Sequence, residues 1–532
     1  MIGSLGGIEM KTKPVRMRNA PSRRDALGVG ALGLGAMLGG CVTASVKERA
    51  EAQPVQPPTT SGSAAPAAPR VPRGDGRLLT PTISAYIANI RNAPVNPEFL
   101  ELGKRHILDT LAAAVSCKDL EPAMLGRKYA LTKSGDAKNG ATMLATKERV
   151  GLVDAAFGSA MIVHGSEIND FIPSAFVQPG PAVIGTAFAL AENRGRSGHD
   201  LLRACVAGYE LCGRVPKALG VSTLYASGLA NHGIGPCFGA AATAASMLAL
   251  PPEKVALVMS YTCQQASGSW QWLLDDDHVE KTFVFAGVGA RNGIEAALMV
   301  EAGYTGVTDC FDNPGGYMNH KAFADGADHD PFYLIEELDT RSEFHHTAYK
   351  RYPVGGPTQP AVQALLELLP KTSPETVTSI VMEMPGRWEA FRNAEMPALN
   401  LRYLASIILI DGRLDLVSAQ DRVRFNTDAR VRELMKKMDV VHAPDLETPA
   451  GQAREEPARV KLVDARTGRH ELHVPFVRGF PSHPMTREDV TAKATELMWP
   501  VLGRSRTSEV IDAVMNIEKL DAAAKILPMI AV

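Results

Sequence analysis

A stretch that is poor in bulky and charged side chains, residues 231–293, constrains the fold more than any other feature. It opens with NHGIGPCFGAAATAASMLAL and closes with HVEKTFVFAGVGARNG. Glycine and alanine at this density let backbones approach closely, so the stretch predicts tightly packed helices, with an Ala-rich helix over residues 238–250. Histidine and lysine are costly to bury in such surroundings unless they bind a charged partner. The stretch therefore favours a polar pocket around His232, His278 and Lys281, although a core histidine and a solvated lysine would explain each residue alone.

The length and the charge of the chain narrow the class of protein. Its 532 residues are enough for two structural domains and a targeting segment. Hydrophobic residues make up 45% of the chain and the net charge is -2, as in an ordinary globular enzyme. A nucleic-acid-binding protein would carry a basic stripe, and the sequence has none, so nucleic acid is not an expected partner.

Residues 1–45 have the composition of a bacterial export signal. Basic residues precede the uncharged run ALGVGALGLGAMLGG, which is too short and too rich in glycine for a membrane span. The paired arginines of SRRDAL predict recognition by the twin-arginine export machinery. LGGC then resembles a lipobox, in which Cys41 is lipidated; alternatively, Cys41 is removed with the signal. We expect a periplasmic protein, anchored to the membrane if Cys41 carries lipid.

The next segment and the cysteines fit an exported protein that folds before export. Residues 46–78 are rich in Pro, Ala and Ser and have no aromatic residue, which predicts a disordered linker. Six further cysteines follow Cys41, in apolar or small-residue surroundings and without metal-type C-x-x-C spacing. Because the twin-arginine route exports proteins that have folded in the reducing cytoplasm, we expect free core cysteines.

The remaining chain changes its pattern twice. Residues 79–347 are predicted to be helical, because apolar residues recur at intervals of three and four in segments such as LGKRHILDTLAAAV and GIEAALMVEAG. Residues 348–485 mix helices with the strand VTSIVMEMP and the hairpin ARVKLVDARTGRHELHVPF, which indicates a smaller α+β domain. Thr486 then begins a further helix, and residues 486–532 are predicted to return to the helical domain. The fold class expected is mainly α with an α+β part.

Two further segments carry candidate polar groups. VHGSEINDF places Glu167 and Asp170 just after His164, at the end of a predicted helix. KRYPVGG places Lys350 and Arg351 before a rigid proline turn. A capped helix end and an exposed basic pair, respectively, are the alternative structural interpretations.

Taken together, the motifs resemble one enzyme family. HGSEIND, NHGIGPCFGAAATAASMLAL, HVEKTFVFAGVGARNGIEAALMVEAGYTGVTD, YKRYPVGG, LRYLASIILIDGRL and GFPSHPMT follow one another in the order and spacing of the MmgE/PrpD family. That family contains 2-methylcitrate dehydratases, cis-aconitate decarboxylases and an iminodisuccinate epimerase. The resemblance implies a large all-helical domain made from both ends of the mature chain, an inserted α+β lid domain, a homodimer, and neither a metal nor an organic cofactor.

The resemblance also implies roles for individual residues. Glu167 stands where the family usually has an aspartate. The residues that match polar family positions are Asp170, His232, Lys350, Arg351 and Tyr403. Lys281 resembles the family lysine ahead of the glycine-rich helix entry, but it lies six rather than five residues before Gly287. Lys350, Arg351 and Tyr403 are expected to bind substrate. Other polar family positions are lost here: a His-Pro pair has become Gln178 and Pro179, a threonine has become Phe171, and a histidine has become Gly355.

The chemistry that the family shares is the removal or relocation of a proton next to a carboxylate, which needs a base, cations and an acid. We assign His232 and His278 as acid/base candidates, Lys281 and Lys350 as carboxylate-binding cations, and Glu167 or Asp170 as an orienting or second acid/base group. The function expected is a cofactor-independent lyase, a hydratase or dehydratase acting on a small hydroxy or unsaturated acid. Two alternatives stay open: an epimerase or isomerase with the same proton chemistry, and an exported binding protein whose site has decayed.

Overall fold

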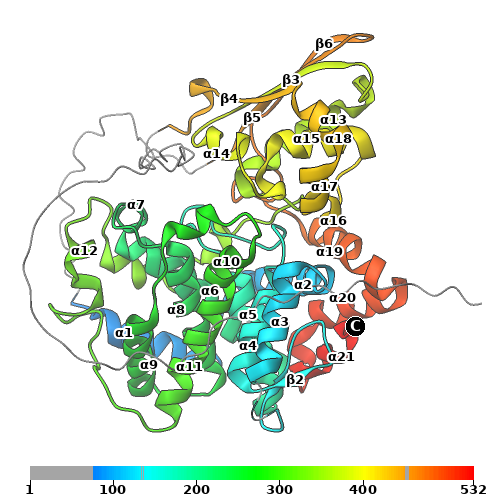
Figure 1. Ribbon diagram of the computed structural model, residues 1–532. Coiled ribbons are helices and arrows are strands. Elements are labelled where there is room, and N and C mark those ends of the chain that lie inside the picture. The colour runs from blue at the N-terminus through cyan, green and yellow to red at the C-terminus, as the bar shows by residue number, and fades with distance from the viewer. Residues whose placement is uncertain (1–75, 134, 136, 450–454) are drawn as a thin grey trace, which may run out of the picture. The chain divides into compact units, whose positions relative to one another are not determined.

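The computed structural model describes residues 76–133, 135, 137–449 and 455–532 (Figure 1). Most of these residues are helical, and the strands form a four-stranded mixed sheet and a two-stranded hairpin. The predicted fold class, mainly α with an α+β part, is therefore confirmed. The predicted export signal, Cys41 and nearly all of the predicted linker lie outside the described residues.

The first part of the described chain is a stack of helices interrupted by the short hairpin β1 (Ala141–Thr142) and β2 (Arg149–Val150). Its helices are α1 (Leu79–Asn89), α2 (Pro97–Cys117), α3 (Glu121–Lys133), α4 (Leu152–Val163), α5 (Pro179–Arg194), α6 (Gly198–Leu219), α7 (Val221–Ala226), α8 (Asn231–Met247), α9 (Pro252–Gln265), α10 (Val279–Thr282), α11 (Val288–Glu301) and α12 (Lys321–Ala324).

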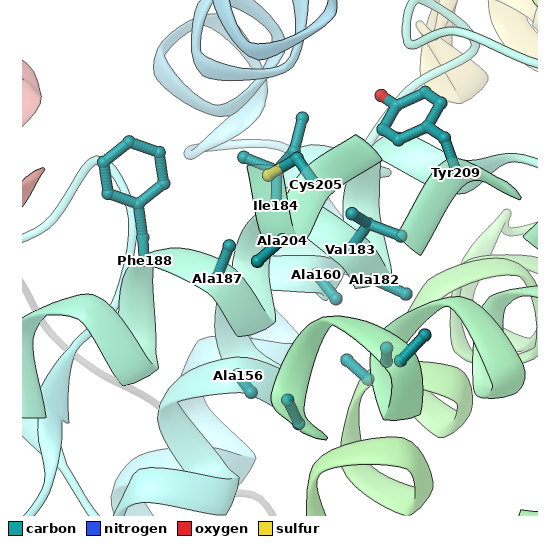
Figure 2. Close-up of a cluster of buried hydrophobic side chains, with 14 of the residues drawn as sticks. Ala156, Ala160, Ala182, Val183, Ile184, Ala187, Phe188, Ala204, Cys205 and Tyr209 are labelled. Atoms are coloured by element: carbon teal, nitrogen blue, oxygen red, sulfur yellow. The ribbon is translucent and has the colours of Figure 1, made fainter. Parts of the chain in front are cut away.

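Small side chains let these helices approach closely. In Figure 2, alanines of α4, α5 and α6 face one another, and larger side chains such as Phe188 and Tyr209 fill the remaining space. One close approach that concerns the site is between α8 and α11. A Cβ atom added at Gly293 would lie 2.6 Å from both the backbone nitrogen of Ala241 and the carbonyl oxygen of Cys237, so only glycine fits there.

Helix α8 begins seven residues earlier than predicted: Asn231, and not Phe238, is its first residue. The helix therefore includes His232 in its first turn and Pro236 in its interior. Pro236 cannot donate to the carbonyl of His232, which costs one helical hydrogen bond. Buried packing on both sides of the proline, against α6 and α11, holds the backbone helical in spite of that loss.

The α+β part has its own hydrophobic core. Its strands lie in the order β4-β3-β5-β6, with β4 parallel to β3 and the other pairs antiparallel; their bounds are β3 (Val377–Met384), β4 (Met438–His442), β5 (Ala458–Asp464) and β6 (Gly468–Val474). The predicted strand and hairpin are thus present, and β4 is an addition to them. The helices of this part are α13 (Gln359–Leu368), α14 (Trp388–Arg392), α15 (Leu401–Asp411), α16 (Leu416–Ala419), α17 (Arg422–Thr427) and α18 (Ala429–Met435). Figure 1 shows α13, α15 and α18 on one face of the sheet, in agreement with the alternating burial along β5.

The C-terminal helices share a core with the first helices. They are α19 (Arg487–Leu502), α20 (Arg504–Met515) and α21 (Leu527–Ile530). Helix α19 begins at its N-cap Thr486, as predicted, and Thr486 forms a capping box with Asp489. Helix α19 packs along α2, and the buried Lys493 of α19 pairs with Asp109 of α2 at 2.6 Å. Residues from both ends of the described chain therefore contribute to one hydrophobic core.

Helices α10 and α11 are joined by a π-helical turn, Phe283–Gly287, into one continuous helical stretch. By length and composition alone, Val279–Glu301 could cross a membrane, but 61% of its most apolar window is buried in the protein. It packs against α4, α8 and α9, which is typical of a core helix. The six cysteines of the described chain are free thiols, five of them buried and Cys263 half-buried.

Candidate active site

The carboxylate of Glu167 joins three other side chains in one buried group, called here the Glu167 cluster: Glu167, His278, Lys281 and Lys350. Its Oε1 accepts hydrogen bonds from the His278 Nε2 at 3.0 Å and from the Lys281 Nζ. Its Oε2 accepts from the Lys350 Nζ at 3.0 Å. All four residues are at most 4% exposed. Burial alone would raise the pKa of Glu167, but Lys281, Lys350 and the His278 hydrogen bond hold that pKa well below its usual range. The carboxylate is therefore ionised and bridges two buried ammonium groups.

Backbone pairing brings Lys350 to Glu167. Phe171 and Ala348 exchange two backbone hydrogen bonds, of 3.0 and 2.7 Å, so the segment after Glu167 runs antiparallel to the segment before Lys350. The Lys350 Nζ also lies 5.4 Å from the centroid of the Phe171 ring. Two residues distant in sequence thus meet because a short β-bridge sets their register.

Asp170 does not join the Glu167 cluster, although the sequence suggested an acid/base role for it. Its Oδ2 accepts from the Tyr209 hydroxyl at 2.6 Å and from the His106 Nδ1 at 2.9 Å, and its Oδ1 accepts from the Gly180 backbone nitrogen at 3.1 Å. These partners lie on α6, α2 and α5. Asp170 therefore fixes the loop that carries Glu167 to three helices.

His278 has an unusual backbone and a defined tautomer. Its φ of +64° is in the left-handed region, which costs free energy in a residue other than glycine, and such strain is common at functional sites. Because an ionised carboxylate can only accept a hydrogen bond, the His278 Nε2 must carry the hydrogen that it donates to Glu167. The Nδ1 is then the acceptor, and the hydroxyl of Thr282 lies 2.9 Å from it. Burial lowers the pKa of His278 although Glu167 opposes that effect, so the imidazole is neutral.

His164, the residue that directly follows α4, was not assigned a role from the sequence, yet it lies beside this cluster. Its ring stacks on that of His278 with centroids 5.1 Å apart, and its Nδ1 is 3.4 Å from the Thr282 hydroxyl. Its Nε2 has no hydrogen-bond partner among the described residues. Burial, reinforced by His278, lowers its pKa well below the usual histidine value. The feature of the sequence that could have indicated a role for His164 is its position three residues before Glu167.

His232 lies among aromatic rings. It stacks on Phe285 with centroids 3.9 Å apart, and Trp270 and Trp272 meet it edge-on at 5.3 and 5.2 Å. Its Nδ1 has no hydrogen-bond partner within the described part of the chain. Burial first, and then the charge of Lys281, lower the pKa of His232 well below its usual value. His232 is therefore a neutral imidazole.

Phe285 links His232 to the Glu167 cluster. The Lys281 Nζ lies 5.2 Å from the centroid of Phe285 and 5.3 Å from that of Trp272. Phe285 belongs to the π-helical turn between α10 and α11, a feature that occurs often at functional sites because it redirects side chains. His232, His278 and Lys281, the site residues predicted within residues 231–293, thus lie around the Phe285 ring and the Glu167 carboxylate. The sequence gave no sign of the role of Phe285 or Trp272.

Two predicted substrate-binding residues are not brought to the cluster. Tyr403 is buried in the core of the α+β part, where its hydroxyl donates to the carbonyl oxygen of Ser418 at 2.7 Å. Arg351 points to the exposed Glu496, with which it pairs at 3.0 Å. From the α+β part, Gln420 donates instead to the hydroxyl of Ser166 at 2.7 Å, next to Glu167 in the sequence.

This arrangement suits the chemistry of a carboxylic acid. The described residues contain no group of three or more His, Cys, Asp or Glu side chains placed as metal ligands would be. Lys281 and Lys350 can stabilise negative charge, and a neutral imidazole such as His232 can accept a proton. The site therefore combines a cationic subsite with a neutral base.

Comparison with known proteins gives two family matches that together span most of the chain. The MmgE/PrpD N-terminal domain matches residues 81–329, and the MmgE/PrpD C-terminal domain matches residues 352–518. The cis-aconitate decarboxylase-like protein oryM of Aspergillus oryzae is 23% identical over 487 residues, which cover 85% of this chain and 97% of the relative. A cis-aconitate decarboxylase of Aspergillus terreus is also 23% identical, over 489 residues, covering 85% and 96% of the two chains.

Proposed function

Because the chain belongs to the MmgE/PrpD family, we propose that it is a lyase that removes water from a small hydroxy acid, or adds it back, next to a carboxylate. The family and the similarity to the decarboxylases support the lyase class and a small carboxylic acid as substrate. The observation that carries the proposal is the pair of buried lysines, Lys281 and Lys350, on one ionised carboxylate close to the neutral His232.

The two lysines bind the substrate carboxylate and acidify the neighbouring C–H bond. When that proton leaves, negative charge spreads onto the carboxylate, and cations fixed beside it stabilise the transition state more than the ground state. Lys281 and Lys350 are already oriented by Glu167, so little reorganisation is needed during the reaction. Glu167 therefore acts as a positioning residue, and His278 orients Glu167.

His232 serves as the base and then as the acid. Its imidazole takes the proton from the carbon, and the resulting imidazolium returns a proton to the departing hydroxyl, which leaves as water. The C–H and C–O bonds break, a C=C bond forms, and His232 ends neutral as it began. A pKa lowered by burial makes His232 a weak base but its conjugate acid a strong one, which favours the second transfer. The lysines compensate for the weak base by acidifying the substrate.

The test is turnover of a panel of hydroxy acids and unsaturated acids in deuterated water, followed by NMR. We expect loss or gain of water together with deuterium incorporation at the carbon next to the carboxylate, and much slower rates of both with His232→Ala. Deuterium exchange without net chemistry would support an epimerase or isomerase instead. The absence of both exchange and elimination across the panel would contradict the proposal and leave a binding protein as the better interpretation.

Decarboxylation is a second candidate, favoured by the similarity to the two Aspergillus proteins. The same lysines and imidazole would stabilise and protonate the carbanion formed when CO₂ leaves. A coupled assay for CO₂ release from the same panel distinguishes the two reactions. Release of CO₂ indicates decarboxylation, and loss of water without CO₂ indicates dehydration.

A further inference from the structure

The charges buried in the Glu167 cluster add up to one excess positive charge. Lys281 and Lys350 contribute two cations, and Glu167 contributes one anion. The imidazoles that surround them are neutral because burial lowers their pKa values. One anionic group on a ligand would therefore bring the buried site to neutrality.

Other acids near the cluster are already occupied. Asp275 is only half-buried, and its Oδ2 accepts the backbone N–H of Lys281 at 2.8 Å. Asp277 pairs with Arg422. Asp170 is held by the bonds described above. Among the described residues, none of these three acids pairs with the Nζ of Lys281 or Lys350, whose ion pairs are both with Glu167.

The walls around the ammonium groups are apolar. Lys281 faces Trp272 and Phe285, and Lys350 faces Phe171. Trp272, Phe285, Val284 and Ala230 form a hydrophobic cluster of their own, against which Trp270 packs. The indole N–H of Trp272 is the buried donor in this wall that lacks a partner among the described residues. A second or third ligand carboxylate would meet ring faces here, and burying an unpaired carboxylate costs several kcal/mol.

The apolar character continues to the surface. Leu273 and Leu274 follow Trp272 in the 3-10 helix Trp270–Leu274 and are 36% and 84% exposed. Phe176, 37% exposed, has its ring centroid 6.4 Å from that of His232 and adopts a φ of +52°. A bulky residue in the left-handed region is strained, so its position is maintained by its surroundings. Exposed apolar side chains next to a buried aromatic wall favour an apolar ligand.

We infer that the substrate is a monocarboxylic acid with an apolar body, and that the site discriminates against di- and tricarboxylates. The single carboxylate occupies Lys281 and Lys350, and the apolar body contacts Trp272 and Phe285. This inference rests on the proposed function, because it takes the Glu167 cluster as the substrate site.

Binding of unreactive saturated acids to the full chain, measured by calorimetry, tests the inference without requiring turnover. Hydrocinnamate has one carboxylate and a phenyl ring, succinate has two carboxylates, and tricarballylate has three. We expect hydrocinnamate to bind at least about tenfold more tightly than either of the others, because only it leaves no unmatched buried charge. Equal or tighter binding of succinate or tricarballylate would overturn the inference.

Two variants and one control variant test separately the effect of the buried net charge and that of the aromatic side chains. Glu167→Gln adds one net positive charge, so the ratio of succinate affinity to hydrocinnamate affinity should rise about tenfold. Glu280→Gln makes the same charge change on an exposed residue of α10 and should leave that ratio unchanged. Trp272→Ala should weaken hydrocinnamate about tenfold and butyrate much less, because it removes ring contact and not charge.

The outcomes separate this inference from the proposed function. Preferred binding of a dicarboxylate that is then dehydrated refutes the inference and supports the function. Preferred binding of hydrocinnamate by a protein that exchanges no substrate proton supports the inference and refutes the function. Binding of none of the three acids refutes the inference, and it refutes the function as well only if the substrate panel shows neither proton exchange nor elimination.

Discussion

Replacing Glu167 by glutamine should remove the charge that holds the site together. The side chain keeps its size, and its amide oxygen can still accept a hydrogen bond. Lys281 and Lys350, however, lose the anion that both ammonium groups contact, the latter at 3.0 Å from Oε2. Two buried cations then repel each other with no anion between them. Glu167→Gln should therefore destabilise the folded protein.

The size of the loss follows from the burial of the group. Removing one partner of a buried ion pair costs about 3–5 kcal/mol, because the remaining charge stays buried without compensation. Glu167 is 1% exposed and serves two lysines and one histidine, so a surface value of about 0.2–1 kcal/mol does not apply. The pKa of Glu167 lies well below 4.5, and each unit of that shift corresponds to about 1.4 kcal/mol. A loss of about 3–5 kcal/mol is expected.

The pH dependence has a definite sign. Because folding lowers the pKa of Glu167, the stability it contributes is fully present above its unfolded pKa, near 4.5, and is lost as the pH falls through the folded value. Glutamine does not titrate. The difference in unfolding free energy between the wild type and Glu167→Gln should therefore be constant just above pH 4.5 and shrink at lower pH.

Urea unfolding at a series of pH values, followed by circular dichroism, measures that difference. Glu167→Asp retains the charge and should recover part of the stability, whereas the exposed Glu280→Gln should change it by less than about 0.5 kcal/mol. If Glu167→Gln were as stable as the wild type near neutral pH, or if the difference grew on acidification, the assignment of Glu167 as a buried, ionised bridge would be wrong.

Four other predictions concern the chemistry, the loop and export. His232→Ala should lower kcat by roughly 10²- to 10⁴-fold with little change in substrate affinity, measured beside a thermal melt that separates misfolding from lost catalysis. Lys281→Ala should raise KM, and also lower kcat if the contact tightens in the transition state, with a total loss on the order of 2–4 kcal/mol; unchanged kinetics on the acid that the panel identifies would exclude Lys281 as the carboxylate subsite. Asp170→Asn should lower stability by about 1–3 kcal/mol and reduce kcat through the displaced loop, whereas a loss of activity without a loss of stability would indicate direct catalysis. Changing both Arg23 and Arg24 to lysine should leave a precursor in the cytoplasm on cell fractionation, and an unchanged periplasmic yield would refute export by the twin-arginine route.

Local signals made much of the fold predictable. The hairpin turn at ARTG, the proline that ends β3 and the Thr486 cap each act within a few residues, and all three are present. Strand β4 was missed because its short sequence, MDVVH, directly follows a predicted helix and offers no turn signal. The early start of α8 was missed because Pro236 and nearby glycines argue against helix locally, and tertiary packing overrides them.

The sequence suggested candidate site residues but not the contacts between them. Histidine and lysine in a small-residue stretch are conspicuous, which is why His232, His278 and Lys281 could be named in advance. Stacking and cation–π contacts cross between segments, so no spacing in the sequence indicates that Phe285 lies between His232 and Lys281. A resemblance transfers a position and not the direction of a side chain, and Tyr403 lies in the core of the α+β part in this structure.

Each segment that contributes a charged residue to the Glu167 cluster is also held by contacts outside the cluster. These contacts help to keep the buried charges in place. Asp170 ties the Glu167 loop to three helices, and the Phe171 bridge to Ala348 fixes the approach of Lys350. At Gly293, α11 approaches α8 so closely that the helix carrying His232 and the stretch carrying Lys281 are held together. In the proposed reaction, these supports would keep the ammonium groups in place while charge develops on the substrate. A preorganised pair of cations would then need no reorientation in the transition state, so that a weak base such as the proposed His232 could still remove the proton.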